Sequence, residues 1–510
     1  MDNGCNKKRK IINTYKTIKM KTTIFTILAA LLLVVGCTKD FEELDRPKAT
    51  SNQIEPGPLF TRSLVTGSGI SVGIWQWMHQ ISGSVYAQHF ANIQTGANFT
   101  ADNYEPRAWN EVWDWYYARS NFAPMHYNYH VIKLSQELEN PITEAVARIW
   151  SVYMIQQLTD MYGDMPVFEA FEKIKPAFDR QKDIYLHLLD EIQTATDMIE
   201  AYRGAGYIGF GQSDVLYNGN LDHWISFANS LGMRLALRAS STAEFDAAIK
   251  PFLTTLNISQ TISSEQQTAK IIPDPDGPTY HVKNPLFFVH GWNEVRMSQT
   301  MYDLLTGLND PRMMVFFAPN ANGEYAGLPN GQPHELLSGG YHDYFRPNYN
   351  NIGDFFIQDE SPHNLFTYAE ASFLKAEAAH RGFISGSAEA FYNEGITASF
   401  KQFGITEQEV IDEYLSGPAK YDASRALEQI YEQRWLALYP NGHEAWSLVR
   451  RTGHPEMQQP VYTFPGNDEM PRRKPYPSSE RQHNAENYQV AVDRMGGDSQ
   501  YTRMWWDGGN

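Results

Sequence analysis

The chain has 510 residues, 42% of them hydrophobic, and a formal net charge of −17. This acidic balance excludes nucleic acid as a partner, because nucleic-acid binding requires a basic surface. It is compatible with a neutral or cationic ligand. The two cysteines, Cys5 and Cys37, both precede the body of the chain, which excludes a disulfide framework or a Cys-ligated metal site there.

The N-terminus carries a targeting signal. The apolar run 24–35, preceded by Lys21, is shorter than the ~20 residues needed to span a bilayer and is typical of a secretory signal. It ends in Val-Val-Gly-Cys37, which resembles a bacterial lipobox. We therefore expect residues 1–36 to be removed, with Met20 as the true start, and Cys37 to become the lipid anchor that attaches the protein to a membrane.

Residues 37–58 are expected to form a flexible tether, because Ser, Asn, Pro and Gly dominate its second half. Lys39 is followed by clustered acids, a pattern that resembles a surface-export signal of Bacteroidota lipoproteins. A merely solvated tether is the alternative. Residues 59–510 are predicted to form a single domain.

Two segments of this domain are predicted to be irregular insertions, at about 60–107 and 257–362, because Gly, Asn and Pro interrupt their hydrophobic pattern. Aromatic rings there could stack on the apolar faces of sugars, with amides and carboxylates binding the hydroxyls. The candidate ligand-binding residues are Trp75, Trp77, Tyr104, Trp292, Tyr325 and Tyr341. By contrast, Trp109, Trp113 and Tyr117 recur at i, i+4 and i+8, which predicts a core face.

Helical periodicity dominates from residue 108 onward. Asn140-Pro141 is a strong helix start, and the helix that follows is apolar on two faces, which predicts that it lies between two layers. Further helices are expected at 182–202, 222–239, 243–256, 297–308, 365–381, 388–403, 426–438 and 444–450. The pair 365–403 has the length of one tetratricopeptide-type hairpin. A strand is expected at 313–317, and the tail 471–510 is expected to be mostly loop.

Motifs for catalysis are weak. Gly69-Ile-Ser71-Val-Gly73 has the spacing of a nucleophile elbow but lacks the flanking strand that such an elbow requires. His443-Glu444 lacks the second His of a zinc protease motif, so no metal site is predicted. A loop calcium at 274–277 and a surface hydrolase that uses two carboxylates stay open alternatives. No cofactor and no enzymatic activity are predicted.

Seven motifs in order resemble the SusD/RagB family of nutrient-binding lipoproteins, in its SusD-like branch. They begin with Leu-Thr-Asp-Met-Tyr-Gly-Asp-Met-Pro at 158–166 and the Trp-x-x-Phe-Ala-Asn-Ser-Leu helix at 224–231, and continue with the Tyr-Ala-Glu helix at 368–378. Gln433-Arg-Trp, Glu444-Ala-Trp, the segment 450–455 and the segment 471–477 follow.

This resemblance implies an all-α fold of tetratricopeptide-like hairpins with irregular insertions that form the ligand face. It also implies a surface lipoprotein that delivers oligosaccharides to a TonB-dependent, SusC-like transporter. A lid that binds peptides or other nutrients is the alternative. The motif residues themselves are interpreted as scaffold, and Arg450 and Arg451 are expected to pair with buried acids such as Glu377 or Glu444.

Overall fold

The computed structural model describes residues 55–94, 96, 99, 101–107, 109–117, 122–274, 283–333 and 342–509. Met1–Glu55 and Pro56–Asn510 form two separate units, and all elements named below belong to the second. The expected signal peptide, the expected lipid anchor at Cys37 and the expected tether as far as residue 54 lie outside the described residues, as does Tyr341. No helix in the described part has the length and apolar character needed to cross a membrane.

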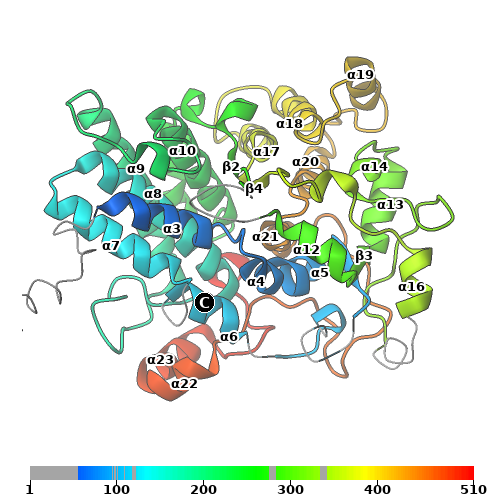
Figure 1. The fold of residues 1–510 in the computed structure, drawn as a ribbon, viewed down its shortest axis with the longest axis horizontal. Helices are drawn as coiled ribbons and strands as arrows, with labels where there is room; N and C mark the ends of the chain where they lie inside the picture. Colours follow the sequence, from blue (N-terminus) through cyan, green and yellow to red (C-terminus); the bar gives the residue numbers. More distant parts are fainter. Residues whose placement is uncertain are drawn as a thin grey trace, which may run out of the picture. The chain divides into compact units, whose positions relative to one another are not determined.

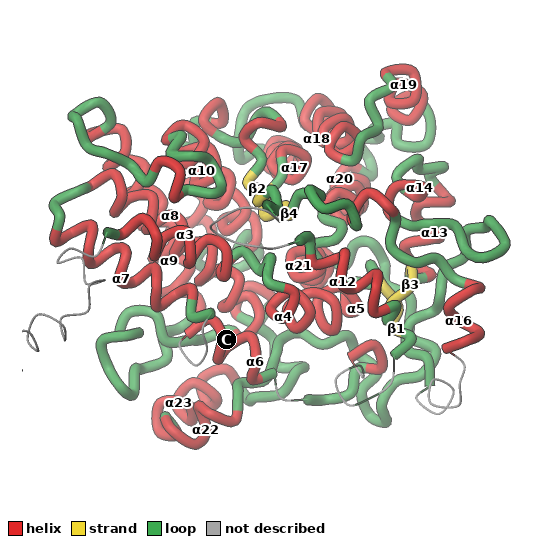
Figure 2. Tube along the Cα trace, in the orientation of Figure 1, coloured by secondary structure: helices red, strands yellow, loops and turns green. Residues whose placement is uncertain are grey.

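The fold consists mainly of helices, which confirms the predicted class (Figure 2). In the first half, α7, α8, α9 and α10 pack each against the next, and α3 and α6 both pack against α7, so that the helices form tetratricopeptide-like hairpins (Figure 1). Their order in the chain is α3 (Pro56–Gly67), α6 (Asn110–Tyr117), α7 (Pro124–Glu137), α8 (Pro141–Tyr162), α9 (Gln181–Tyr202), the 3-10 turn η3 (Gly211–Ser213) and α10 (Leu221–Arg238).

Helix α8 is the central layer of this half. The Asn140 side chain caps it by accepting hydrogen bonds from the backbone N–H groups of Ile142 and Thr143, and Pro141 occupies the first position. Both faces are buried between α7 and α9, as predicted from the two apolar stripes. Gly163, with φ of 86°, ends the helix in a backbone conformation that only glycine adopts freely.

The second half contains the predicted 365–403 hairpin. Helix α17 (Tyr368–His380) packs against α18 (Ala388–Gln402), and both contact α20 (Ala426–Ala437). Thr367 and Ser387 cap the first two helices with side-chain oxygens that accept from backbone N–H groups. The remaining helices here are α19 (Gln408–Ser416) and α21 (Gly442–Thr452).

The segment 60–107 is not an irregular insertion, and this expectation is wrong. It begins in α3 and continues through α4 (Val72–Trp75), the π-helix η1 (Gln76–Gly83) and α5 (Ser84–Tyr86), before the short elements β1 (Phe90–Asn92) and η2 (Ala101–Asn103). Helix η1 packs against α21 so closely that a Cβ at Gly83 would lie 2.7 Å from the backbone of Gly442. The segment therefore belongs to the core scaffold.

The segment 257–362 consists of short elements joined by loops. Two antiparallel strand pairs hold it to the rest of the chain: β1 with β3, where Phe90 faces Met297, and β2 with β4, where Ile271 faces His363. The elements of this segment and its borders are η4 (Phe245–Ile249), α11 (Lys250–Thr255), η5 (Ile258–Gln260), η6 (Glu265–Gln267), β2 (Ala269–Ile271), α12 (Pro285–Trp292), β3 (Val295–Met297), α13 (Gln299–Gly307), α14 (Met313–Phe316), α16 (His342–Asn348), η8 (Asp354–Phe356) and β4 (His363–Phe366).

Two local expectations are corrected. The predicted strand at 313–317 is the short helix α14. The tail is not mostly loop, because it forms α22 (Ser478–His483), α23 (Ala485–Met495) and η9 (Trp505–Asp507). Its aromatic end reaches the core, since Trp506 is 1% exposed.

Candidate ligand-binding face

Helix α12 carries the most accessible of the tryptophans predicted to bind ligand. Asn284 caps the helix by accepting from the N–H of Leu286 at 2.9 Å, and Pro285 occupies its first position. Leu286 and Val289 point into the core, while Trp292 at the C-terminal end stays 38% exposed. The half-buried Phe288 ring lies 6.5 Å from the Trp292 ring, so the two form a local aromatic platform.

Polar groups follow this platform directly. Asn293 ends α12 in the left-handed conformation, and Glu294 comes next. The Glu294 Oε2 atom accepts hydrogen bonds from Gln80 Nε2 at 2.7 Å and Gln76 Nε2 at 3.4 Å. Its other oxygen, Oε1, receives no hydrogen bond from the described residues. The carboxylate is therefore held in place with one acceptor atom left for a ligand.

Trp115 extends the aromatic surface, and sequence reasoning missed it. It is half-buried on α6, and a Cβ at Gly73 of α4 would lie 3.5 Å from its ring. Trp115 thus lies against α4, and α12, which carries Trp292, also packs against α4. The signal was available: Trp115 follows the core residue Trp113 by two positions, which places it on the opposite side of the helix.

The other residues predicted to contact a ligand are less accessible than Trp292. Trp75 and Tyr104 are 2% and 3% exposed and lie in the core, so neither offers a ring face to a ligand, and these two assignments are corrected. Trp77 is half-buried, and the guanidinium of Arg107 covers its ring at 4.6 Å. Tyr325 is half-buried on the loop after α14 and, within the described residues, makes no ring contact with Trp292.

We define the α4–α12 face by five partly exposed residues on or next to helices α4, α6 and α12: Gln76, Trp115, Phe288, Trp292 and Glu294. It combines partly exposed rings with a carboxylate and an amide. Sugars have apolar C–H faces and polar edges, so this combination of groups suits them.

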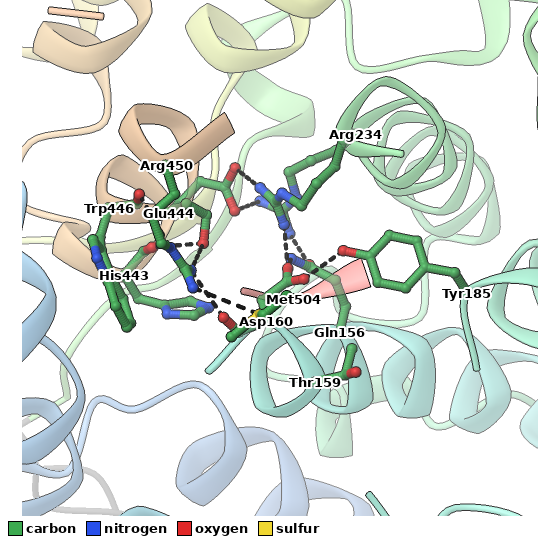
Figure 3. A network of polar contacts seen from close by, with 12 residues as sticks. Gln156, Thr159, Asp160, Tyr185, Arg234, His443, Glu444, Trp446, Arg450 and Met504 are labelled. Carbon is green, nitrogen blue, oxygen red and sulfur yellow. Dashed lines mark hydrogen bonds and ion pairs between the residues drawn. The ribbon is translucent and has the colours of Figure 1, made fainter. Parts of the chain in front are cut away.

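The family's charged motif residues lie elsewhere, in a buried network at the centre of the fold (Figure 3). Its core consists of three arginines and three carboxylates that are at most 3% exposed: Arg234, Arg238, Arg434, Asp160, Glu370 and Glu444. Arg238 contacts both Asp160 and Glu444, and Arg434 Nη2 donates to Glu370 and Glu444 at 2.9 Å each. These pairs connect α8, α10, α17, α20 and α21.

The ion pairs make this network a structural scaffold, although the Nε atoms of Arg234 and Arg434 have no hydrogen-bond partner among the described residues. Burial alone would raise the pKa of the Glu444 carboxyl, but the guanidinium groups of Arg238, Arg234 and Arg434 outweigh burial and lower the pKa to about 2. Arg451 donates to both oxygens of Glu377 at 2.6 and 2.7 Å, as expected. Arg450 instead donates to the backbone carbonyls of Arg472 and Asp160 and stacks on Trp446, so its predicted pairing with an acid is wrong.

The weak catalytic motifs have structural roles. Ser71 of the Gly-x-Ser-x-Gly motif lies between α3 and the short helix α4, and the described residues 55–70 before it contain no strand. Glu444 of the His-Glu motif belongs to the arginine network. Over the described ranges, no group of three or more His, Cys, Asp or Glu side chains is arranged to hold a metal ion.

Comparisons with known proteins identify relatives. The SusD-like family described as "Starch-binding associating with outer membrane" matches residues 48–477. A chitin-binding SusD homolog from Flavobacterium johnsoniae is 24% identical, with a TM-score of 0.76 over 89% of this chain and 98% of that chain. A SusD homolog from Bacteroides uniformis is 26% identical, with a TM-score of 0.77 over 89% and 99% of the two chains.

A further structure, described as a chitin-binding protein, is 26% identical, with a TM-score of 0.75 over 89% of this chain and all of that chain. No curated protein matches the sequence. The family is described as starch-binding and as associated with the outer membrane. With most of its length matched, this chain belongs to the SusD-like family of outer-membrane-associated binding proteins.

Proposed function

We propose that this protein captures oligosaccharides at the cell surface through the α4–α12 face and delivers them to a TonB-dependent, SusC-like transporter. The observation that carries the proposal is the partly exposed Trp292 next to Glu294, whose carboxylate keeps one oxygen without a donor. The ring would stack on the apolar face of a sugar, and Glu294 Oε1 would accept from a hydroxyl or amide N–H group.

The chemistry of the face favours a neutral or weakly cationic glycan. Within the α4–α12 face the only ionisable group is a carboxylate, and the whole chain is strongly acidic, so an anionic polysaccharide would be repelled. Two relatives are described as chitin-binding. We therefore propose chitin-derived oligosaccharides as the first ligands to test, because their acetamido N–H groups can donate to Glu294.

Anchoring is proposed to depend on Cys37 alone. Its thiol follows the signal sequence directly, and acylation at Cys37 would attach the mature chain to the outer membrane through the 37–58 tether. Cys37→Ala should abolish incorporation of labelled palmitate and release the protein from the membrane fraction. A variant that is still acylated and still sediments with outer membrane would contradict this.

The binding proposal is tested by isothermal titration of the unlipidated chain from Thr38 onward with an oligosaccharide panel and a peptide panel. We expect heat from at least one oligosaccharide, its loss in Trp292→Ala, and no product released from any panel member. Binding of peptides alone would favour the peptide-binding alternative. Product that disappears with one carboxylate substitution would favour a hydrolase.

A further inference from the structure

Two histidines on α7 face each other across one helical turn. His126 and His130 are four residues apart, and their Nε2 atoms are 3.0 Å from one another. His130 is exposed and His126 half-buried, so solvent reaches the pair. In this arrangement one imidazole nitrogen donates and the other accepts, and a metal ion could replace the shared proton.

Aromatic rings hold the two imidazoles in place. The ring of Phe171, from the loop between α8 and α9, lies 5.4 Å from the His126 ring, and the Tyr129 ring lies 5.4 Å from the His130 ring. Phe171 and Tyr129 also contact each other, at 5.5 Å. Within the described part of the chain, no carboxylate pairs with either histidine. Both imidazoles are therefore positioned, and their facing nitrogens are not bound to an acid.

The present separation of the two nitrogens is compatible with one class of coordination geometry. Imidazole nitrogen binds first-row metals at about 2.0–2.1 Å. An ion at that distance from two nitrogens 3.0 Å apart forms an N–metal–N angle of about 90°. That angle belongs to octahedral and square-planar complexes, whereas tetrahedral zinc would need a separation of about 3.4 Å.

We propose that His126 and His130 form a chelating site for one Cu²⁺ or Ni²⁺ ion. These ions prefer tetragonal or octahedral geometry and imidazole donors. Because the described residues offer no third metal ligand, the remaining coordination positions would hold water or a donor from another molecule.

The site lies on α7, apart from the α4–α12 face, and does not depend on the proposed glycan binding. It is tested on the chain from Thr38 onward, without a polyhistidine tag, by titration with CuCl₂, NiCl₂ and ZnCl₂ in a non-chelating buffer at pH 7.5. We expect one Cu²⁺ or Ni²⁺ per chain and weaker Zn²⁺ binding. The Cu²⁺ complex should show two imidazole nitrogens by electron paramagnetic resonance.

Matched variants decide the outcome. His126→Asn and His130→Asn should each weaken binding about tenfold or more, because a chelate loses one of two ligands. His380→Asn, at a lone exposed histidine, should leave it unchanged. Thermal melting of all three variants shows whether the fold persists. Equal metal binding by the parent and the folded His126→Asn variant, or tighter binding of Zn²⁺ than of Cu²⁺, would overturn the proposal.

Discussion

The substitution Trp292→Ala tests whether the Trp292 ring binds ligand or serves only as part of the core. The Trp292 side chain is 38% exposed. If the whole residue offers about 250 Å², the exposed part is about 95 Å². A sugar that covers between half and all of this exposed area gains about 1.2–2.4 kcal/mol of binding free energy, at 25 cal/mol per Å² of buried apolar area. Removing the ring should weaken binding about 7- to 50-fold at 1.4 kcal/mol per decade.

The matched control is Trp150→Ala in α8. Trp150 is fully buried, and its Nε1 donates to Ser63 Oγ at 3.0 Å. Its loss should cost about 3–5 kcal/mol of folding free energy. Isothermal titration and thermal melting are run on both variants. The reasoning is refuted if Trp292→Ala binds the parent's ligand with unchanged affinity, or if it melts as early as Trp150→Ala.

Three further predictions concern the scaffold. Arg451→Met leaves the Glu377 carboxylate buried without its bidentate partner, so the free energy of unfolding, measured with denaturant, should fall by about 3–5 kcal/mol. An unchanged unfolding midpoint would contradict the structural role of this pair. Burial lowers the pKa of His89 from 6.5 to about 3 and that of His363 from 6.5 to about 4, so the unfolded chain binds more protons than the folded chain in acid. Each histidine should therefore remove about 1.4 kcal/mol of folding stability per pH unit as the pH falls from about 6 to about 4. A urea midpoint that stays constant over this pH range would refute the prediction. Gly83→Ala would place a Cβ 2.7 Å from the backbone of α21 and should destabilise by about 1–3 kcal/mol, and a variant as stable as the parent would contradict the close packing of η1 on α21.

The long helices were predictable because their signals are local. Asn140-Pro141 starts α8, and the two apolar stripes show that it lies between layers. The segment 60–107 was misjudged because the π-helix η1 departs from the 3.6-residue period on which helix prediction depends, and because glycines such as Gly83 serve close packing. The tail helices α22 and α23 are only 6 and 11 residues long, so each offers a short window in which to recognise a helical pattern.

The candidate site was only partly predictable. The sequence indicated aromatic residues as candidates, and Trp292 is partly exposed in the structure, but exposure is decided by tertiary packing that a single sequence does not reveal. Trp75 lies in the core although Gln76, its neighbour, reaches the surface. Glu294 could not be singled out, because its position next to Gln76 and Gln80 depends on contacts more than 200 residues apart in the chain.

The most direct test of the account is a crystal structure of the protein with an oligosaccharide found by titration. The account predicts a sugar ring stacked on Trp292, at about 3.5–4 Å between carbon atoms, with a hydroxyl or amide group donating to Glu294 Oε1. An oligosaccharide bound at another surface, with Trp292 and Glu294 free of contact, would contradict it.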